Sequence, residues 1–426
     1  MYRVWDFVST YSLLMIAGAV IAFAWANIDP ESYHALVEWS LWDDAPIGYA
    51  SYAADGSVSY RTLTLHSLVN DLLMAFFFAV AAKEVWEAVA LRNGALRGSK
   101  AAVPLIATAG GMAGPILVYL GLAALLGSDT FDAVARGWAI PTATDIAFSY
   151  IVARVIFGAG HPAIRFLLLL AIADDAAGLV IIAIFYPSGD LQPAWLLLSL
   201  SAALAVWLLA NRLPLLLDRG REARPWSRWA RETLSFWPYA LAGAASWYGF
   251  QEAGLHPALG LLPIVPTIPH AETDFGIYAD AEEARPDLLN GIEHALQMPV
   301  QVILLLFGLL NAGVVVGSTD AATWLVLAGL LVGKPLGVLA AGWLAVRVLG
   351  LRLPAGMGLG EVLVVGCVAA IGFTVSLFVA GVAFPPGAML GGASLTEAAK
   401  LGALLSVLAA PMAWAAAQAV GVRRVP

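Results

Sequence analysis

The sequence is short of charge and of cysteine. Only 12% of its residues are charged and 61% are hydrophobic, against about 25% and about 45–50% in soluble domains. This balance excludes an ordinary soluble protein and predicts a polytopic membrane protein. The single cysteine, Cys367, excludes an intramolecular disulfide and a cysteine metal site. The formal net charge of -8 says little about partners. No basic patch is interleaved with aromatic residues, so we expect no nucleic-acid partner.

Apolar segments fill most of the chain and predict an all-α fold with about twelve transmembrane helices, forming one membrane domain over residues 1–426. Several segments are shorter than the roughly 20 residues that a straight span needs. The segments are Leu13–Ile28, Leu65–Leu91, Ala101–Leu126, Trp138–Phe157, Phe166–Tyr186, Trp195–Leu209, Leu234–Phe250, Ala258–Ile268, Ile292–Val316, Ala322–Leu349, Val362–Ala383 and Leu401–Val420.

Arginine and lysine placement predicts the orientation. If the amino terminus is cytoplasmic, seventeen of the 22 basic residues fall in cytoplasmic segments, as the positive-inside rule expects for an even number of helices. We therefore expect both termini inside. The string AFAWA at Ala22–Ala26 offers a small-x-small cleavage site, but Asp6 and the eleven later segments favour an uncleaved first helix.

Two adjacent carboxylates, Asp174 and Asp175, interrupt the apolar run Phe166–Tyr186. At about 1.5 Å of rise per residue they lie near the midplane of a hydrocarbon core about 30 Å thick. A carboxylate there costs about 3 kcal/mol on insertion scales, so we interpret the pair as a functional site that faces a wet cavity.

The segment GWAIPTATDIAFSYIV predicts a helix that breaks near its middle. Pro141 removes a backbone donor and disfavours helix at Ile140, while Thr142 and Thr144 can hydrogen-bond the freed groups. Asp145 would then begin the second half-helix and offset the positive end of its dipole. A kinked but continuous helix is the alternative.

A matching weak point occurs in Val362–Phe384, where Gly366, Gly372 and Thr374 interrupt the run and IGFT could form an extended crossing. Two interrupted helices in corresponding halves predict a transporter site built from inverted repeats. Glycine alone is weak evidence, because it is common in spanning helices that pack closely.

Lys334 is the only charge in an apolar run of GLLVGKPLGVLAAGWLAV. A buried ammonium needs a partner, so Lys334 should face carboxylates or the carbonyl ends of the broken helices. The alternative is a lysine that extends to the membrane interface, which is hard to arrange twelve residues into a span.

Asp71 lies about seven residues into its span, so a solvated helix end competes with a role in an ion pathway. Further along the same helix, Lys83, Glu84 and Glu87 form either a surface charge cluster or the acidic mouth of a funnel that attracts cations.

Outside the membrane, YASYAADGSVSYRTL (Tyr49–Leu63) carries Asp55-Gly56 between alternating segments, which predicts a small external β-hairpin. A two-stranded ribbon is marginal by itself, so we expect it to pair with something. A disordered loop is the alternative.

Together these features resemble the NhaA family of bacterial sodium/proton antiporters, in order from about residue 12 to 420. The strings that carry the resemblance are LVNDLLMAFFF, LIATAGGMAGP, GWAIPTATDIAF, AIADDAAGLVIIAIFY, GLHPALG, GIEHAL, LLNAGV, GKPLG and IGFTVSLFVA.

The resemblance implies roles for individual residues. Asp175 is similar to the family's ion-binding carboxylate and proton carrier, and Asp174 to the partner of the lysine that Lys334 matches. Thr144 and Asp145 match residues that line the site and balance helix ends. The remaining matches are Asp71 on the ion path, and Glu84, His256 and Glu293 at positions linked to the pH response.

The resemblance also implies a bacterial inner-membrane protein, with the external hairpin as the contact of a homodimer.

Two departures of this chain from the family pattern affect its expected regulation. The family usually reads close to LEVKRE where this chain has AKEVWEA, with Trp86 at an expected lysine, and the loop His270–Asn290 is longer and more acidic than the family pattern.

A mechanism follows from the chemistry of these residues. Sodium prefers carboxylate, hydroxyl and carbonyl oxygens, and Asp174, Asp175 and Thr144 supply them. If sodium (or lithium) and protons compete for a coupled pair of carboxylates, exchange needs neither covalent chemistry nor a cofactor, and we expect no enzymatic activity. Release of more than one proton per sodium ion would make the exchange electrogenic. Alternating access would come from movement of one helical repeat against the other.

Other protein classes fit less well. An intramembrane aspartyl protease needs YD and GxGD motifs, and GLGE at Gly358–Glu361 is a poor match. A prenyltransferase needs repeated aspartates, which neither NDLLM nor DDAAG provides. A sodium-coupled symporter of a small solute shares broken helices and an ion site, but we find no additional polar groups for an organic substrate.

Overall fold

The computed structural model describes residues 2–52, 58–90, 96, 101–219, 225–269 and 288–425. The chain divides into two compact units. The sheet unit comprises Leu36–Gly94 and Ile182–Ile303, and the crossing unit comprises Tyr2–Ala35, Ala95–Ile181 and Leu304–Pro426. Two of the boundaries fall within long helices, α8 (Pro162–Phe185) and α13 (Leu288–Asn311).

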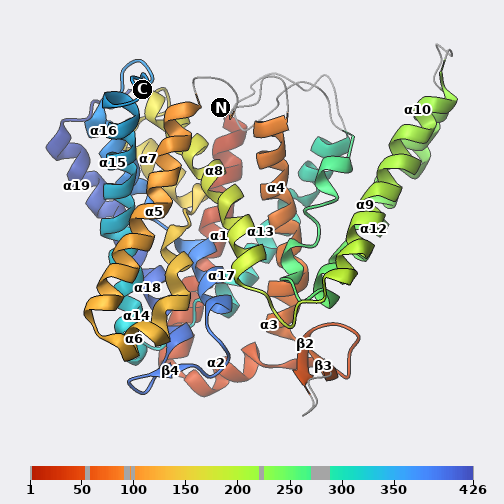
Figure 1. Cartoon of the computed structure of the whole chain (residues 1–426), viewed down its shortest axis with the longest axis horizontal. Helices are drawn as coiled ribbons and strands as arrows, with labels where there is room; N and C mark the ends of the chain where they lie inside the picture. The colour runs from red at the N-terminus through yellow and green to blue at the C-terminus, as the bar shows by residue number, and fades with distance from the viewer. Residues whose placement is uncertain are drawn as a thin grey trace. The chain divides into compact units, whose positions relative to one another are not determined.

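The sheet unit consists of a small antiparallel sheet and apolar helices (Figure 1). Its further elements are β1 (Ser40–Asp43), β2 (Tyr49–Tyr52), β3 (Val58–Thr64), α3 (Leu65–Ser67), η1 (Leu68–Leu73), α4 (Met74–Ala90), η3 (Pro193–Trp195), α9 (Leu196–Val206), η4 (Trp207–Arg212), α10 (Leu213–Leu217), α11 (Pro225–Trp229), η5 (Ala230–Leu234), α12 (Trp237–Glu252), η6 (Pro257–Leu259) and η7 (Val265–Thr267).

The crossing unit is almost entirely helical. Its elements are α1 (Tyr2–Ile28), most of α2 (Pro30–Val37), α5 (Ala102–Leu125), α6 (Ser128–Val134), η2 (Ala135–Thr142), α7 (Ile146–Phe157), η8 (Val316–Ser318), α14 (Ala321–Ala328), η9 (Gly329–Gly333), α15 (Lys334–Arg347), α16 (Leu359–Ala369), α17 (Phe373–Ala383), β4 (Met389–Leu390), β5 (Ala393–Ser394), α18 (Leu395–Leu405), η10 (Ser406–Leu408) and α19 (Ala409–Val420).

Glycine lets two helices of the crossing unit approach at backbone distance. α5 and α15 lie side by side although more than 200 residues separate them in the chain (Figure 1). A Cβ atom at Gly110 would overlap the carbonyl oxygen of Gly337, and one at Gly114 would overlap that of Gly333. Small residues at four-residue spacing are how membrane helices pack closely without side chains between them. This contact holds the helix that begins with Lys334 firmly against α5.

The apolar helices confirm a multi-pass membrane protein, but not twelve spans. Among the described residues, seven helices are long and apolar enough to cross a membrane, or nine if each of two bent pairs is one span. The predicted segment Leu13–Ile28 forms the second part of α1, and Leu234–Phe250 lies largely in the 16-residue α12. Inverted repeats stay a prediction.

The predicted span Ala258–Ile268 is wrong. The chain there forms two short 3₁₀ turns, η6 and η7, and no α-helix. Two prolines within the segment, Pro263 and Pro266, and two that flank it, Pro257 and Pro269, remove backbone donors and block a regular hydrogen-bond ladder. Apolar composition alone could not distinguish this segment from a short span.

The predicted hairpin is confirmed, although its Asp55-Gly56 turn lies outside the described residues. β2 and β3 pair antiparallel, with Ala50 opposite Arg61. The expected additional partner is β1 of the same chain, which pairs with the other edge of β3. Arg61 also forms an ion pair with Glu252 at the end of α12, at 2.9 Å. The sheet is therefore a three-stranded structure tied to a helix of its own unit.

Candidate ion site

The first predicted break is confirmed. η2 ends at Thr142, Ala143 is extended, and α7 begins at Ile146, with a bend of 55° across the break. Pro141 is the penultimate residue of η2, and the Thr142 hydroxyl donates to the carbonyl of Ala139 at 2.7 Å. A kinked but continuous helix is therefore wrong, because the backbone leaves helical geometry between the two halves.

The second predicted break is confirmed as well. α16 ends at Ala369, α17 begins at Phe373, and the bend between them is 52°. Gly372 lies at the turn, where a Cβ atom would overlap the hydroxyl of Ser376 and come within 3.1 Å of the carbonyl oxygen of Ala143. Glycine therefore lets the second break pack closely against the first.

Hydrogen bonds connect the two breaks directly. The amide of Asp145 donates to the carbonyl of Ile371 at 2.7 Å, and the Thr144 hydroxyl lies 3.0 Å from the carbonyl oxygen of Ala369. Two serines add further bonds: Ser149 Oγ donates to Val368 O at 3.0 Å and Ser376 Oγ to Ile140 O at 2.7 Å. The backbone groups freed by the breaks are thus satisfied by the opposite segment, as a low-dielectric interior requires.

Asp145 caps α7, as its position in the sequence predicts. Its Oδ1 accepts from the amide of Phe148 at 2.9 Å, and the side chain is 2% exposed. The structure adds a contact that the sequence did not predict: Oδ2 accepts from the Thr374 hydroxyl at 2.7 Å. One carboxylate therefore lies at the positive ends of both α7 and α17.

Lys334 is fully buried, so the alternative of a lysine that extends to the interface is wrong. Its ammonium donates to Asp174 Oδ2 at 2.6 Å and, through a very short contact, to the carbonyl of Thr142. Both expected kinds of partner are present: a carboxylate and the carbonyl end of a broken helix. The contact with Thr142 places the positive charge at the negative end of η2.

Thr144 joins this group from the crossing point. Its hydroxyl lies 2.7 Å from Asp174 Oδ2, the same oxygen that accepts from Lys334. Asp174 is 2% exposed, and its Oδ1 has no hydrogen-bond partner in the part of the chain that the structure describes. Asp175, next along α8, is partly exposed. The two neighbouring carboxylates therefore differ in burial, with Asp174 buried and Asp175 more accessible.

In the sheet unit, two other predicted residues come together. Asp71 lies in the π-helical turn η1, and its Oδ1 is 3.9 Å from His256 Nε2. His256 Nδ1 accepts from the amide of Ala258, which leaves Nε2 to carry a proton toward the carboxylate. Trp247 donates to the carbonyl of Asp71 at 2.9 Å and fixes the turn in place.

The charged residues of α4 are not a surface cluster. Lys83 and Glu87 are 5% and 4% exposed, and the Lys83 ammonium lies 2.8 Å from Glu87 Oε2 and 2.6 Å from Glu293 Oε2. Glu84 lies close enough to Glu293 to interact with it electrostatically. Glu84 and Glu293 could be assigned from the sequence, but the role of Lys83 in joining α4 to α13 could not. A partial signal was the i, i+4 spacing of Lys83 and Glu87.

Known proteins similar to this chain identify its family. The model of the Na+/H+ antiporter 1 family matches residues 6–417. The chain is similar to the Na(+)/H(+) antiporter NhaA of Jannaschia sp. (strain CCS1), with 67% identity over 96% of each chain. It is also similar to NhaA of Desulfitobacterium hafniense (strain DSM 10664 / DCB-2), with 44% identity over 99% of this chain and 97% of that one. The chain belongs to the NhaA family. This confirms the resemblance, and the family is one of transporters rather than enzymes.

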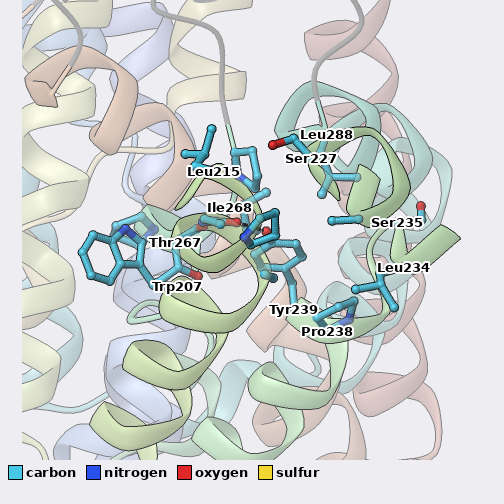
Figure 2. Close-up of a pocket in the computed structure, with 16 residues that line it drawn as sticks. Trp207, Leu215, Ser227, Leu234, Ser235, Pro238, Tyr239, Thr267, Ile268 and Leu288 are labelled. Carbon is cyan, nitrogen blue, oxygen red and sulfur yellow. Dashed lines mark hydrogen bonds between the residues drawn. The ribbon is translucent and has the colours of Figure 1, made fainter. Parts of the chain in front are cut away.

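This NhaA-family chain also holds a cavity that the sequence analysis did not predict (Figure 2). It lies in the sheet unit, has a volume of about 230 Å³ and contains none of the predicted site residues. Asn211 fixes one wall, because its amide donates to the carbonyl of Thr267 at 2.6 Å and its oxygen accepts from Tyr239. The wall depends on the prolines that prevent a helix at Ala258–Ile268.

Proposed function

We propose that this protein exchanges cytoplasmic Na+ or Li+ for external H+ across the bacterial inner membrane. The observation that carries the proposal is the meeting of Thr144, Asp174 and Lys334 at the crossing of two broken helices, one residue from Asp175. Family membership supports the pair of transported ions. We place both termini in the cytoplasm, on the distribution of arginine and lysine.

The charges at the crossing suggest why the site binds cations. Each helix end carries about half an elementary charge, so the two positive ends near Asp145 together offset its single negative charge. Lys334 likewise offsets the negative end at Thr142 and pairs with Asp174. Asp175 is the next residue of α8 and is partly exposed, so it is the more accessible of the two carboxylates. We assign it the role of competitive carrier of Na+ and H+.

We assign Asp174 and Thr144 as further oxygen ligands of the sodium ion. The Thr144 hydroxyl has one proton and two acceptors within reach, Asp174 Oδ2 and Ala369 O. When a cation occupies Asp174, the hydroxyl can donate to Ala369 and turn its lone pair toward the ion. Asp174 Oδ1 is buried and offers a second oxygen for the ion.

We propose that exchange is electrogenic. Asp174 and Asp175 can together take up two protons, whereas one sodium ion brings a single positive charge. If the proton-loaded and sodium-loaded forms alternate, more than one proton crosses for each sodium ion. Alternating access would come from movement of one helical repeat against the other around the crossed helices. The bends of 55° and 52° supply two comparable breaks for such repeats.

We propose that Asp71 lies on the ion pathway and that Glu84, His256 and Glu293 take part in a pH response. Asp71 and His256 approach within 3.9 Å, and Glu293 pairs with Lys83, so three of the four are in direct contact with another ionisable side chain. A change of pH that alters the protonation state of one member of such a pair also alters the electrostatic attraction between the two members. Lys83 belongs in this cluster in place of the lysine that the family pattern has at Trp86.

We also propose a homodimer formed through the sheet. Four large side chains of the sheet and its approach are more than half exposed, namely Trp39, Trp42, Tyr49 and Tyr60, at 58%, 55%, 57% and 52%. Aromatic residues are enriched at protein interfaces, where they bury a large area at low entropic cost.

Proteoliposomes test the exchange. Vesicles acidified inside should lose their proton gradient when sodium or lithium is added outside, followed by recovery of fluorescence from a pH-sensitive dye between pH 6 and 9. Asp175→Asn should abolish the recovery, because an amide cannot carry the exchanged proton. The substitution Ser201→Ala, at an exposed serine of α9 in the sheet unit, is the control and should leave the rate unchanged. Persistence of exchange in Asp175→Asn would contradict the site assignment.

A further inference from the structure

The half-helices α7 and α17 of the crossing unit start close together, and the N-cap residue of α17 has no side chain that could accept a hydrogen bond. The residue at the N-cap position of α17 is Gly372, which has no side chain to accept from the first-turn amides. A Cβ atom at this position would overlap Ser376 Oγ, so a larger residue would displace that hydroxyl. The cap of α17 must therefore come from another segment of the chain.

Asp145 supplies that cap, and Thr374 holds it. Asp145 Oδ2 accepts from the Thr374 amide at 3.2 Å and from the Thr374 hydroxyl at 2.7 Å, so the hydroxyl makes the shorter contact. Oδ1 of the same carboxylate accepts from Phe148 in α7 at 2.9 Å. Thr374 is 7% exposed and is the second residue of α17, a position at which helix formation does not require a hydroxyl. The buried hydroxyl of Thr374 is satisfied by the Asp145 carboxylate.

The position of Asp145 controls the position of Thr144. The two residues are consecutive, and both are bonded to the second break, Asp145 N to Ile371 O at 2.7 Å and Thr144 Oγ1 to Ala369 O at 3.0 Å. Thr144 in turn lies 2.7 Å from Asp174. A change in the cap of α17 therefore reaches the proposed ion ligands through one peptide unit.

We infer that Thr374 is a positioning residue for the ion site, which acts through Asp145 to hold the Thr144 hydroxyl against Asp174 and so sets the apparent affinity for Na+. The inference rests on the proposed function, because it assigns Thr144 and Asp174 as ion ligands. Thr374 itself does not touch the ion.

The experiment compares Thr374→Val, which removes the hydroxyl at constant shape, with Thr374→Ser, which keeps it. Thr374→Val should raise the apparent KM for Na+ about tenfold, the size expected for loss of a hydrogen bond to a charged group, with a smaller change in the maximal rate. Thr374→Ser should stay within about twofold of the natural protein. An unchanged KM in Thr374→Val, or an equal change in both variants, would overturn the inference.

Thr323→Val is the matched control. Thr323 is also a buried threonine of the crossing unit, and its hydroxyl donates to the carbonyl of Ala398 at 2.8 Å, away from both breaks. Loss of this hydroxyl should lower thermal stability while leaving the apparent KM unchanged. A KM that rises as much as in Thr374→Val would show a general effect of removing a buried hydroxyl and would overturn the inference.

A double-mutant cycle tests whether Thr374 acts through Asp145. The readout is the increase in melting temperature of the purified protein on adding Na+, which reports binding even in a variant that does not transport. Thr374→Val should reduce this increase in the natural background and have no further effect in Asp145→Asn. Additive effects would contradict action through Asp145. Thr374→Ala provides the same comparison if Thr374→Val does not fold.

The proposed function and the inference fail in different ways. If Asp175→Asn abolishes exchange while Thr374→Val leaves the sodium KM unchanged, the exchange mechanism stands and the role of Thr374 is wrong. If Asp175→Asn still exchanges, the site assignment itself is wrong, whatever Thr374 does.

Discussion

Two buried lysines organise the two units of this protein, and they are stabilised in different ways. Lys334 in the crossing unit is fully buried and bonds one carboxylate oxygen of Asp174 and one backbone carbonyl. Lys83 in the sheet unit bonds two carboxylates, Glu87 one turn along its own helix and Glu293 on α13. The first arrangement needs a broken helix to supply the carbonyl group, whereas the second joins two continuous helices.

The difference in burial between the two clusters predicts which of them tolerates substitution better. The Lys334 and Asp174 side chains are 0% and 1% exposed, whereas that of Glu293 is 28% exposed and can be solvated if its partner is lost. Removing one member of a fully buried pair leaves an uncompensated charge, and water cannot reach it. The crossing cluster should therefore be the more sensitive of the two.

The largest effect is expected for Lys334→Met. Loss of the ammonium leaves the buried Asp174 without its countercharge and the Thr142 carbonyl without this donor, which should lower stability by about 3–5 kcal/mol. The melting temperature of purified protein measures this change. Adding Asp174→Asn to the variant should recover part of the loss, because it removes the stranded charge. If the double variant is less stable than the single one, charge pairing does not explain the role of Lys334.

A smaller effect is expected for Lys83→Met. Glu293 can be solvated, so the loss should be about 1–2 kcal/mol, mainly from the buried Glu87. Exchange should persist while its pH dependence changes, which the dye assay at several pH values measures. A loss as large as in Lys334→Met would remove the distinction between the two clusters. Unchanged stability would mean that both carboxylates are already solvated.

The smallest effect concerns His161, which belongs to neither lysine cluster and lies just before α8. Burial lowers the pKa of its ring, and its Nδ1 accepts from the amide of Ala163 at 3.1 Å, which requires the neutral form. Folding thus favours the neutral form, so its contribution to stability is present above the unfolded pKa, about 6.5, and is lost as pH falls below it.

His161→Gln should therefore flatten the fall in melting temperature between pH 7.5 and 5.5, with a change of less than about 1 kcal/mol. The variant separates the part of the acid-induced loss of stability that comes from His161 from the part that comes from the carboxylate clusters. A variant that keeps the full acid dependence would assign that dependence to other groups.

Much of the site could be predicted because the residues concerned are anomalies in their local sequence. Pro141 and Gly372 mark the two breaks, and Lys334 and Asp174 are charges in apolar runs that can be stabilised only by each other or by freed backbone groups. Thr374 could not be assigned in the same way. Its role depends on Asp145, 229 positions away, and on the missing side chain of Gly372.

Apolar composition was informative for long segments and misleading for short ones. It correctly predicted the helices around Asp71, Asp174 and Lys334, but it also predicted a span at Ala258–Ile268. There the spacing of prolines overrides composition, because backbone donors are missing every few residues.

By itself the sequence determined that this chain lies in a membrane, where its helices break and which charges need partners, because these follow from local hydrophobicity and backbone chemistry. The resemblance to the family already implied that Lys334 pairs with Asp174. The tertiary structure was needed to show that Lys83 joins Glu87 to Glu293 and that one carboxylate caps two helices. Distance between side chains is set by packing across the fold, and the order of residues along the chain does not contain it.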